Sequence, residues 1–110
     1  MSDKQVVGVD VSKQFLDVCF PDRHLERFGN DSAGREQLAD RIKGVDLVVM
    51  EATGGYESAL ATALLAVGLR VAVVNPRQVR DFARATGRLA KTDRIDAGLI
   101  AAFGQAIEPQ

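Results

Sequence analysis

The chain has few of the residues that tie a small protein together covalently or through a metal. Cysteine and histidine occur once each, as Cys19 and His24, and there is no tryptophan. A single cysteine cannot form an internal disulfide, and one cysteine with one histidine cannot build a zinc finger. We therefore expect an intracellular protein in a reducing compartment, with Cys19 as a small core residue.

Long apolar runs are also missing. None approaches the roughly 20 residues that a membrane-spanning helix needs, and residues 1–7 lack the apolar centre of a signal peptide. The 110 residues, 46% of them hydrophobic and 26% charged, suit one compact domain and leave no room for two. We expect a single domain over residues 1–110 that has no contact with a membrane.

Charge of one sign is not in excess, since 14 basic and 15 acidic residues give a formal net charge of −1. Nucleic-acid-binding domains are usually basic, so this total argues against such a partner. The distribution along the chain argues for one, because residues 77–94 carry a net charge of +4 and the remainder −5. The basic residues of that segment are Arg77, Arg80, Arg84, Arg88, Lys91 and Arg94.

The four arginines of this segment follow three- and four-residue spacing, which places them on one face of a helix if the helix extends to Arg88. Such a face is usually just the solvated side of an amphipathic helix. Here the opposing acids are nearly absent, and the segment leads directly into Asp93 and Asp96. We therefore expect the arginines to contact nucleic-acid phosphates, for which guanidinium groups are well suited.

Apolar periodicity predicts three short strands at residues 6–10, 15–20 and 24–28, close enough to pair as an antiparallel meander. Helices and strands then alternate: a helix at 32–43, a strand at 47–50, a helix opened by Gly54-Gly55 and ended by Gly68, and a strand at 71–74. A third helix begins at Pro76 and ends or bends at Gly87, and the last begins near Thr92 or Asp93 and runs through Phe103.

Two crossover connections of this length imply parallel strands with helices on both faces of the sheet. The predicted class is therefore α/β, with a mixed sheet in which three antiparallel strands precede alternating helices and parallel strands. This arrangement resembles the ribonuclease H-like fold of RuvC type. A flavodoxin-like or actin-like half-domain is the competing assignment.

Two acids stand at the ends of predicted buried strands. Asp10 ends the first strand, and Glu51 ends the strand at residues 47–50. Sites in open α/β sheets form beyond the carboxyl ends of the strands, and an acid there is costly to bury unless something satisfies it. A divalent cation would do so, although Asp10 alone also fits the start of a turn.

Asp93 and Asp96 are three residues apart and share one face of the predicted last helix. The same spacing fits a helix cap, with Asp93 as the N-cap and Asp96 at the third helical position. On spacing alone the cap is the better explanation. Only convergence of all four acids would favour an oxygen-only site, which suits Mg²⁺ or Mn²⁺ rather than zinc.

Two further features leave a structural and a functional explanation open. The backbone N–H groups of Gly54 and Gly55 either admit a phosphate at a helix start or belong to a tight turn. The apolar side chains of Ile100 and Phe103 belong either to the core or to an interface with another domain.

Four stretches, in this order, resemble the DEDD transposases of bacterial insertion elements, the insertion sequence 110 family: residues 8–13 (GVDVSK), 51–56 (EATGGY), 73–80 (VVNPRQVR) and 87–97 (GRLAKTDRIDA). The resemblance covers about residues 6–103, and its last stretch is the most specific. It implies a RuvC-like catalytic domain that uses Mg²⁺ or Mn²⁺. The family's D, E, D and D acids map, with no departure, onto Asp10, Glu51, Asp93 and Asp96.

The resemblance also implies DNA transposition by strand cleavage and transfer, self-association, a structured guide RNA transcribed from the element, and a nucleoid location in the bacterial cytoplasm. The family's nucleophilic serine lies in a C-terminal domain that these 110 residues lack, so the isolated domain is expected to be inactive. Two alternatives remain: a metal-dependent Holliday-junction resolvase or nuclease that uses water, and a non-catalytic module that binds structured RNA or mediates assembly.

Overall fold

The computed structural model describes residues 4–88 and 95–107, and a five-stranded sheet forms its centre. The strand order is β3-β2-β1-β4-β5. The pairs β1–β2 and β2–β3 are antiparallel, whereas β1–β4 and β4–β5 are parallel. The strands are β1 (Val6–Val11), β2 (Phe15–Cys19), β3 (Leu25–Gly29), β4 (Leu47–Glu51) and β5 (Val71–Val74). The predicted α/β class with an antiparallel meander on one side is confirmed, in agreement with a ribonuclease H-like architecture.

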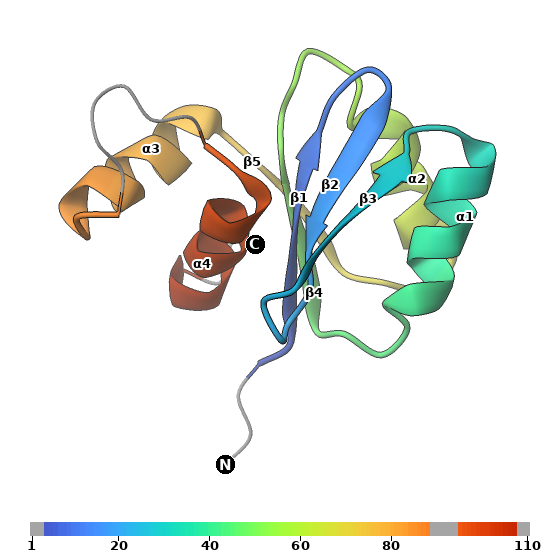
Figure 1. Cartoon of the computed structure of the whole chain (residues 1–110), viewed down its shortest axis with the longest axis horizontal. Coiled ribbons are helices and arrows are strands. Elements are labelled where there is room, and N and C mark those ends of the chain that lie inside the picture. The colour runs from blue at the N-terminus through green and yellow to red at the C-terminus, as the bar shows by residue number, and fades with distance from the viewer. Residues whose placement is uncertain (1–3, 89–94, 108–110) are drawn as a thin grey trace.

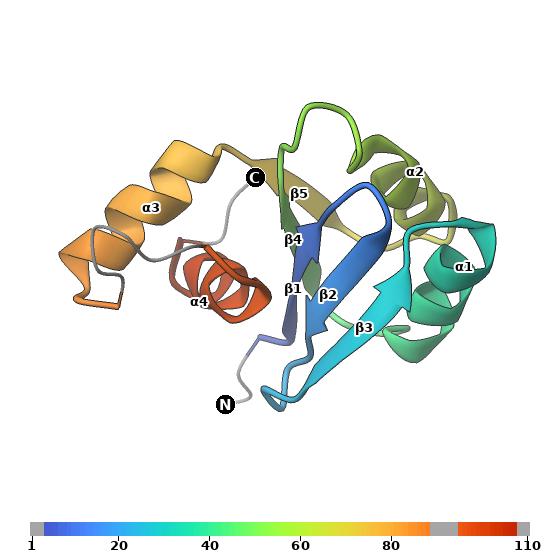
Figure 2. The same ribbon diagram turned by 45° about the horizontal axis from the view of Figure 1, so that its top comes forward.

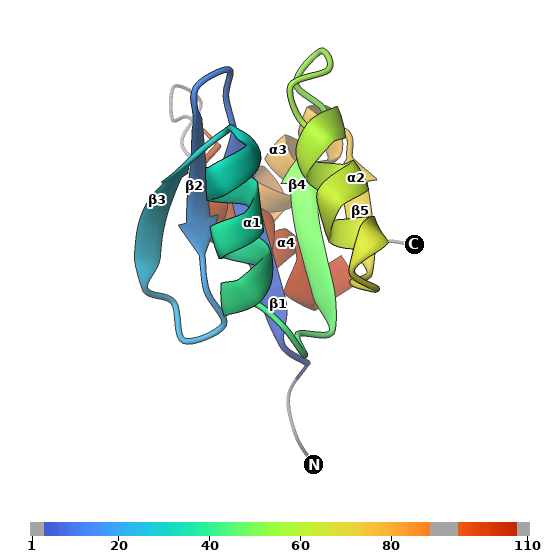
Figure 3. The ribbon, with the colours of Figure 1, turned by 90° about the vertical axis from the view of Figure 1, so that its right-hand side faces the viewer.

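Helices cover both faces of this sheet. They are α1 (Ser32–Arg41), α2 (Ser58–Ala66), α3 (Pro76–Ala85) and α4 (Ala97–Ile107). Figures 1 and 3 show α1 and α2 on one face and α3 and α4 on the other, and Figure 2 shows α4 between α3 and β1. None of the described helices has the length and apolar character needed to cross a membrane.

Side chains that alternate along the strands divide the core into two halves. Val7 and Val9 of β1 pack on the side of α1 and α2, while Val6 packs on the side of α3 and α4. Ile100 and Phe103 of α4 are 0% and 4% exposed and lie in this second half. The core explanation of these two residues is therefore the right one, and Cys19 is buried as predicted.

The backbone of α4 lies directly against β1. A Cβ atom added to Gly8 would lie 2.4 Å from the carbonyl oxygen of Ala97 and 2.5 Å from the nitrogen of Ala101. At the other end of the helix, a Cβ on Gly104 would lie 2.5 Å from Cγ2 of Val49. Two glycines, one on the strand and one on the helix, therefore permit this close approach.

The predicted start of the last helix is wrong. The helix begins at Ala97 rather than at Thr92 or Asp93, and Asp96 stands immediately before it. Oδ1 of Asp96 accepts a hydrogen bond from the N–H of Leu99 at 2.8 Å, so this short side chain satisfies a free N–H of the first turn. Asp96 is thus the capping residue itself rather than a residue at the third helical position. Asp93 lies outside the described residues.

The arginine face predicted for the third helix is shorter than its spacing suggested. The helix ends at Ala85, and Gly87 adopts a left-handed conformation with φ 72°. The N–H of Gly87 donates to the carbonyl of Arg84, and the N–H of Arg88 donates to the carbonyl of Ala83, which together form a Schellman motif. Arg88 therefore lies beyond the end of the helix, and its guanidinium packs over the helix residue Phe82, 5.7 Å from the centre of the ring.

The contact between α4 and β1 can be tested by substitution of Gly8. We expect Gly8→Ala to lower the free energy of unfolding by about 1–3 kcal/mol, because the new methyl group would meet backbone atoms that no side-chain rotation can move. Urea denaturation measures the change. Gly98→Ala on α4 is the matched control, since a Cβ there meets only Oδ1 of Asp96 at 3.4 Å. Equal stability of the two variants would contradict the close approach.

Candidate active site

Asp10 and Glu51 lie side by side at the carboxyl ends of two parallel strands. Val9 of β1 and Met50 of β4 are partners in the parallel pairing, so the acids that follow them are neighbours. Val9 and Met50 both face α1 and α2. Because side chains alternate along a strand, both carboxylates emerge on the face that α3 and α4 cover.

Glu51 is the buried member of this pair. Only 8% of it is exposed, and its Oε2 atom has no hydrogen-bond partner within the part of the chain that the structure describes. Burial raises the pKa of Glu51 above its ordinary value, the negative charge of Asp10 raises it further, and Arg80 acts in the opposite direction. A buried carboxylate oxygen without a partner is costly, so this position fits a bound cation.

Asp96 reaches the same region from α4. The first turn of α4 rests on Gly8, two residues before Asp10. Asp10 and Asp96 line one cavity of about 380 Å³, together with Gly98. Across residues 4–88 and 95–107, no three acidic, histidine or cysteine side chains are close enough to hold an ion by themselves. The fourth predicted acid, Asp93, falls outside those ranges.

A further acid at this edge of the sheet was missed by the sequence analysis. Asp17 of β2 is the direct partner of Asp10 and lines the same cavity. Arg27 of β3 holds it with two hydrogen bonds, from Nε at 2.7 Å and from Nη2 at 3.1 Å, and the guanidinium stacks over the ring of Phe15 at 4.4 Å. Polar and apolar side chains alternate along residues 15–19. In an antiparallel meander, this alternation could have predicted that Asp17 lies on the same face of the sheet as Asp10.

The loop after β4 already binds a carboxylate from its own sequence, that of Glu57. Oε1 of Glu57 accepts hydrogen bonds from the N–H of Thr53 at 2.9 Å, from the Thr53 hydroxyl at 2.9 Å and from the N–H of Gly55 at 3.1 Å. These bonds, the one from the Thr53 backbone first, lower the pKa of Glu57 to about 2. The tight-turn explanation of the glycine pair therefore replaces the phosphate explanation, and α2 begins only at Ser58.

The predicted basic segment contributes unequally to this site. Arg80 is half-buried and close enough to Glu51 to affect its pKa, whereas Arg77 and Arg84 are exposed. Arg84 also lies 3.8 Å from Asp81 of the same helix. Lys91 and Arg94 lie outside the described residues.

The acids at the ends of β1 and β4 and before α4 are the ones that the sequence analysis predicts as the first, second and fourth acids of a DEDD pattern. A family model described as "Transposase", that of the DEDD transposases of the insertion sequence 110 group, matches residues 7–109. The chain belongs to this transposase family. Membership of the DEDD family implies, in general terms, a divalent metal cofactor.

Two relatives of this transposase-family chain are pilin gene-inverting proteins, one from Moraxella lacunata and one from Moraxella bovis. Each is 30% identical over 115 residues, which cover 96% of this chain and 36% of the relative. The chain thus spans about 36% of the length of these relatives.

The Glu57 loop predicts a specific pH dependence. The pKa of this carboxyl is lower in the folded chain than the value near 4.3 of an unfolded one, so its stabilisation is complete above about pH 5 and is lost as the pH falls towards 2. We expect Glu57→Gln to lower the free energy of unfolding by about 1 kcal/mol at pH 7 and to have little effect at pH 2.5. Urea denaturation at both pH values measures the difference.

The matched control for this loop is Glu36→Gln on the exposed side of α1, which should alter stability little at either pH. A Glu57→Gln deficit that stays the same at pH 7 and pH 2.5 would show that the charge of Glu57 does not stabilise the loop.

Proposed function

We propose that residues 1–110 are the RuvC-like catalytic domain of a DNA transposase, in which a set of carboxylates binds Mg²⁺ or Mn²⁺ and acts on a phosphodiester bond. The observation that carries this proposal is the buried Oε2 of Glu51, which lies beside Asp10 and has no hydrogen-bond partner among the described residues. The family to which the chain belongs supports the choice of reaction.

Three of the four carboxylates in this proposal have a defined structural support. Asp10 is held by the central strand β1, Glu51 by β4, and Asp96 by its hydrogen bond to the first turn of α4, while Asp93 is the proposed fourth ligand. Oxygen-only ligands of this kind suit Mg²⁺ or Mn²⁺. When bound, such ions would stabilise the charge that develops on the attacking and leaving oxygens of the phosphate.

DNA is the proposed substrate, and the basic segment is its proposed contact surface. The names of the relatives describe proteins that invert a gene, which is a DNA rearrangement, and this supports the assignment. Arg77, Arg84, Lys91 and Arg94 would contact phosphates, and Arg80 is close enough to Glu51 to lower its pKa. The family resemblance adds a serine-bearing domain, a guide RNA and self-association to the same proposal.

The metal site can be tested on the chain itself. We expect Mn²⁺ to broaden the amide NMR signals of Val11, Ala52 and Ala97. In the Asp10→Asn and Glu51→Gln variants, the same broadening should need at least ten times more Mn²⁺. The neutral amide of Glu51→Gln buries no charge, so thermal unfolding should show that it remains folded. Asp40→Asn on exposed α1 is the control, and equal broadening in all four proteins would disprove the site.

The reaction class is tested in the transposase that carries this domain. Asp10→Asn should reduce recombination of a plasmid substrate by a factor of roughly 10³ or more, because the variant loses a ligand of the reacting centre. The products distinguish the two enzyme classes: joined strands indicate transfer, whereas cut strands with free ends indicate hydrolysis by water. Full activity of Asp10→Asn would exclude both classes.

A further inference from the structure

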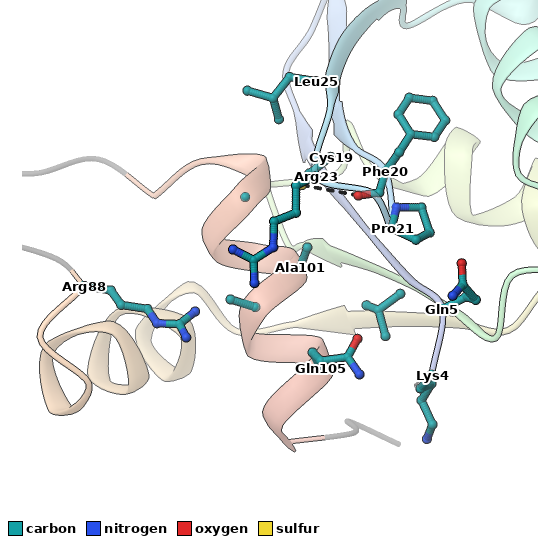
Figure 4. Close-up of a pocket in the computed structure, with 13 residues that line it drawn as sticks. Lys4, Gln5, Cys19, Phe20, Pro21, Arg23, Leu25, Arg88, Ala101 and Gln105 are labelled. Carbon is teal, nitrogen blue, oxygen red and sulfur yellow. Dashed lines mark hydrogen bonds between the residues drawn. The ribbon is translucent and has the colours of Figure 1, made fainter. Parts of the chain in front are cut away.

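A second cavity, of about 690 Å³, runs along α4 from Gly98 to Gln105, between this helix and the β2–β3 hairpin. Three cations from distant parts of the sequence line it: Lys4, Arg23 and Arg88 (Figure 4). No described carboxylate lines it, although the described residues outside it include many acids. The cavity is therefore a basic region in a protein of net charge −1.

This basic cavity adjoins the acidic one, because Leu25 of β3 and Gly98 of α4 line both cavities. Together the two cavities extend from Asp10 and Asp96 along α4 to the cations. We call the two together the α4 groove.

Arg23 occupies a backbone position that an arginine does not favour. Its φ is 75°, in the left-handed region that glycine adopts without strain, and its N–H donates to the carbonyl of Phe20 at 2.8 Å. Within the described residues Arg23 forms no ion pair, and Figure 4 shows its side chain pointing towards α4. A strained residue of this kind points to a role beyond stability.

The hairpin that carries Arg23 is firmly held. His24, just outside β3, places its two ring nitrogens 2.7 Å from Asp22 and 2.8 Å from Glu26, and its ring stacks on Phe20 at 4.4 Å. On the other side of the groove, the Schellman motif and the ring of Phe82 orient Arg88. Contacts within the chain therefore hold the backbone that carries Arg23 and the side chain of Arg88.

We propose that the α4 groove binds the phosphodiester backbone of a nucleic-acid strand, which Arg23, Arg88 and Lys4 contact and lead towards Asp10 and Asp96. This inference rests on the proposed function and adds a binding surface outside the arginines of α3. Guanidinium groups bind phosphate through paired N–H donors, and such contacts do not depend on base sequence. DNA and RNA share this backbone, so the test includes both.

The test measures fluorescence anisotropy of labelled 20-nucleotide single-stranded DNA, RNA of the same sequence, and duplex DNA, from 50 to 300 mM salt. Arg23→Gly should weaken binding roughly five- to tenfold at 0.1 M salt and reduce the slope of log K against log salt by about one. Its melting temperature should be unchanged or higher, because glycine relieves the strain at this position. A loss of affinity would then have no origin in unfolding.

A second variant blocks the groove without removing a charge. A Cβ at Gly98 meets only Oδ1 of Asp96 at 3.4 Å, so the larger side chain of Gly98→Leu would extend into the point where the two cavities join. We expect it to weaken binding at least fivefold although the charge of the groove is unchanged. Arg70→Ala, an exposed arginine before β5, is the control for loss of charge.

Reduced binding by Arg23→Gly and Gly98→Leu, together with near wild-type binding by Arg70→Ala, would support the α4 groove. The groove is then assigned to the nucleic acid for which the two variants lose the most affinity. If the wild type binds and neither variant is impaired, or if Arg70→Ala is impaired as much, the groove is wrong and the proposed function is unaffected. If the wild type binds none of the three nucleic acids, the groove and the proposed DNA contact are both overturned.

Discussion

The approach of the α4 backbone to Gly8 is the constraint on which the rest of the structure depends. Because no side chain separates helix and strand there, the start of α4 is fixed next to the end of β1. Asp96 and Asp10 therefore face one cavity even though 85 residues separate them in sequence. The same helix face forms a wall of the α4 groove, so a single packing contact defines both the acidic and the basic regions.

The acids near this contact differ in what already satisfies them. Glu57 accepts three hydrogen bonds from its own loop, Asp17 accepts two from Arg27, and Asp96 caps α4. Glu51 alone among them has a buried oxygen for which the described residues provide no partner. Glu51 thus differs from Glu57 and Asp17, whose carboxylates stabilise a loop and a strand pair, while the capping bond of Asp96 uses only its Oδ1 atom.

The sequence was sufficient to predict the order of elements and the position of two site acids. The apolar run at residues 47–50 and the β-branched residues of β1 are stable only in a buried sheet, and acids at the carboxyl ends of such parallel strands lie at one edge of it. The start of α4 was not predictable in the same way, because Thr92, Asp93 and Asp96 are all good capping residues within five positions. Tertiary packing of Ala97 against β1 selects among them.

Other parts of the site needed information that no local pattern contains. The position of Asp17 depends on the pairing register of β1 and β2, and the three cations of the α4 groove come from segments without common periodicity. The departure of Arg88 from the α3 face did have a signal, since Gly87 was expected to end or bend that helix. What was missing was the direction of the chain after a Schellman turn.

The buried oxygen of Glu51 that lacks a partner among the described residues would, with a bound cation, affect the lifetime of the folded protein. A cation that binds only to the folded chain links folding to metal supply, and at a free concentration ten times its Kd it would add about 1.4 kcal/mol to the free energy of unfolding. The centre of the sheet would then be most easily opened, and most accessible to proteases, when divalent ions are scarce. The resistance of the protein to proteolysis and the fraction of it that carries the metal would then increase or decrease together.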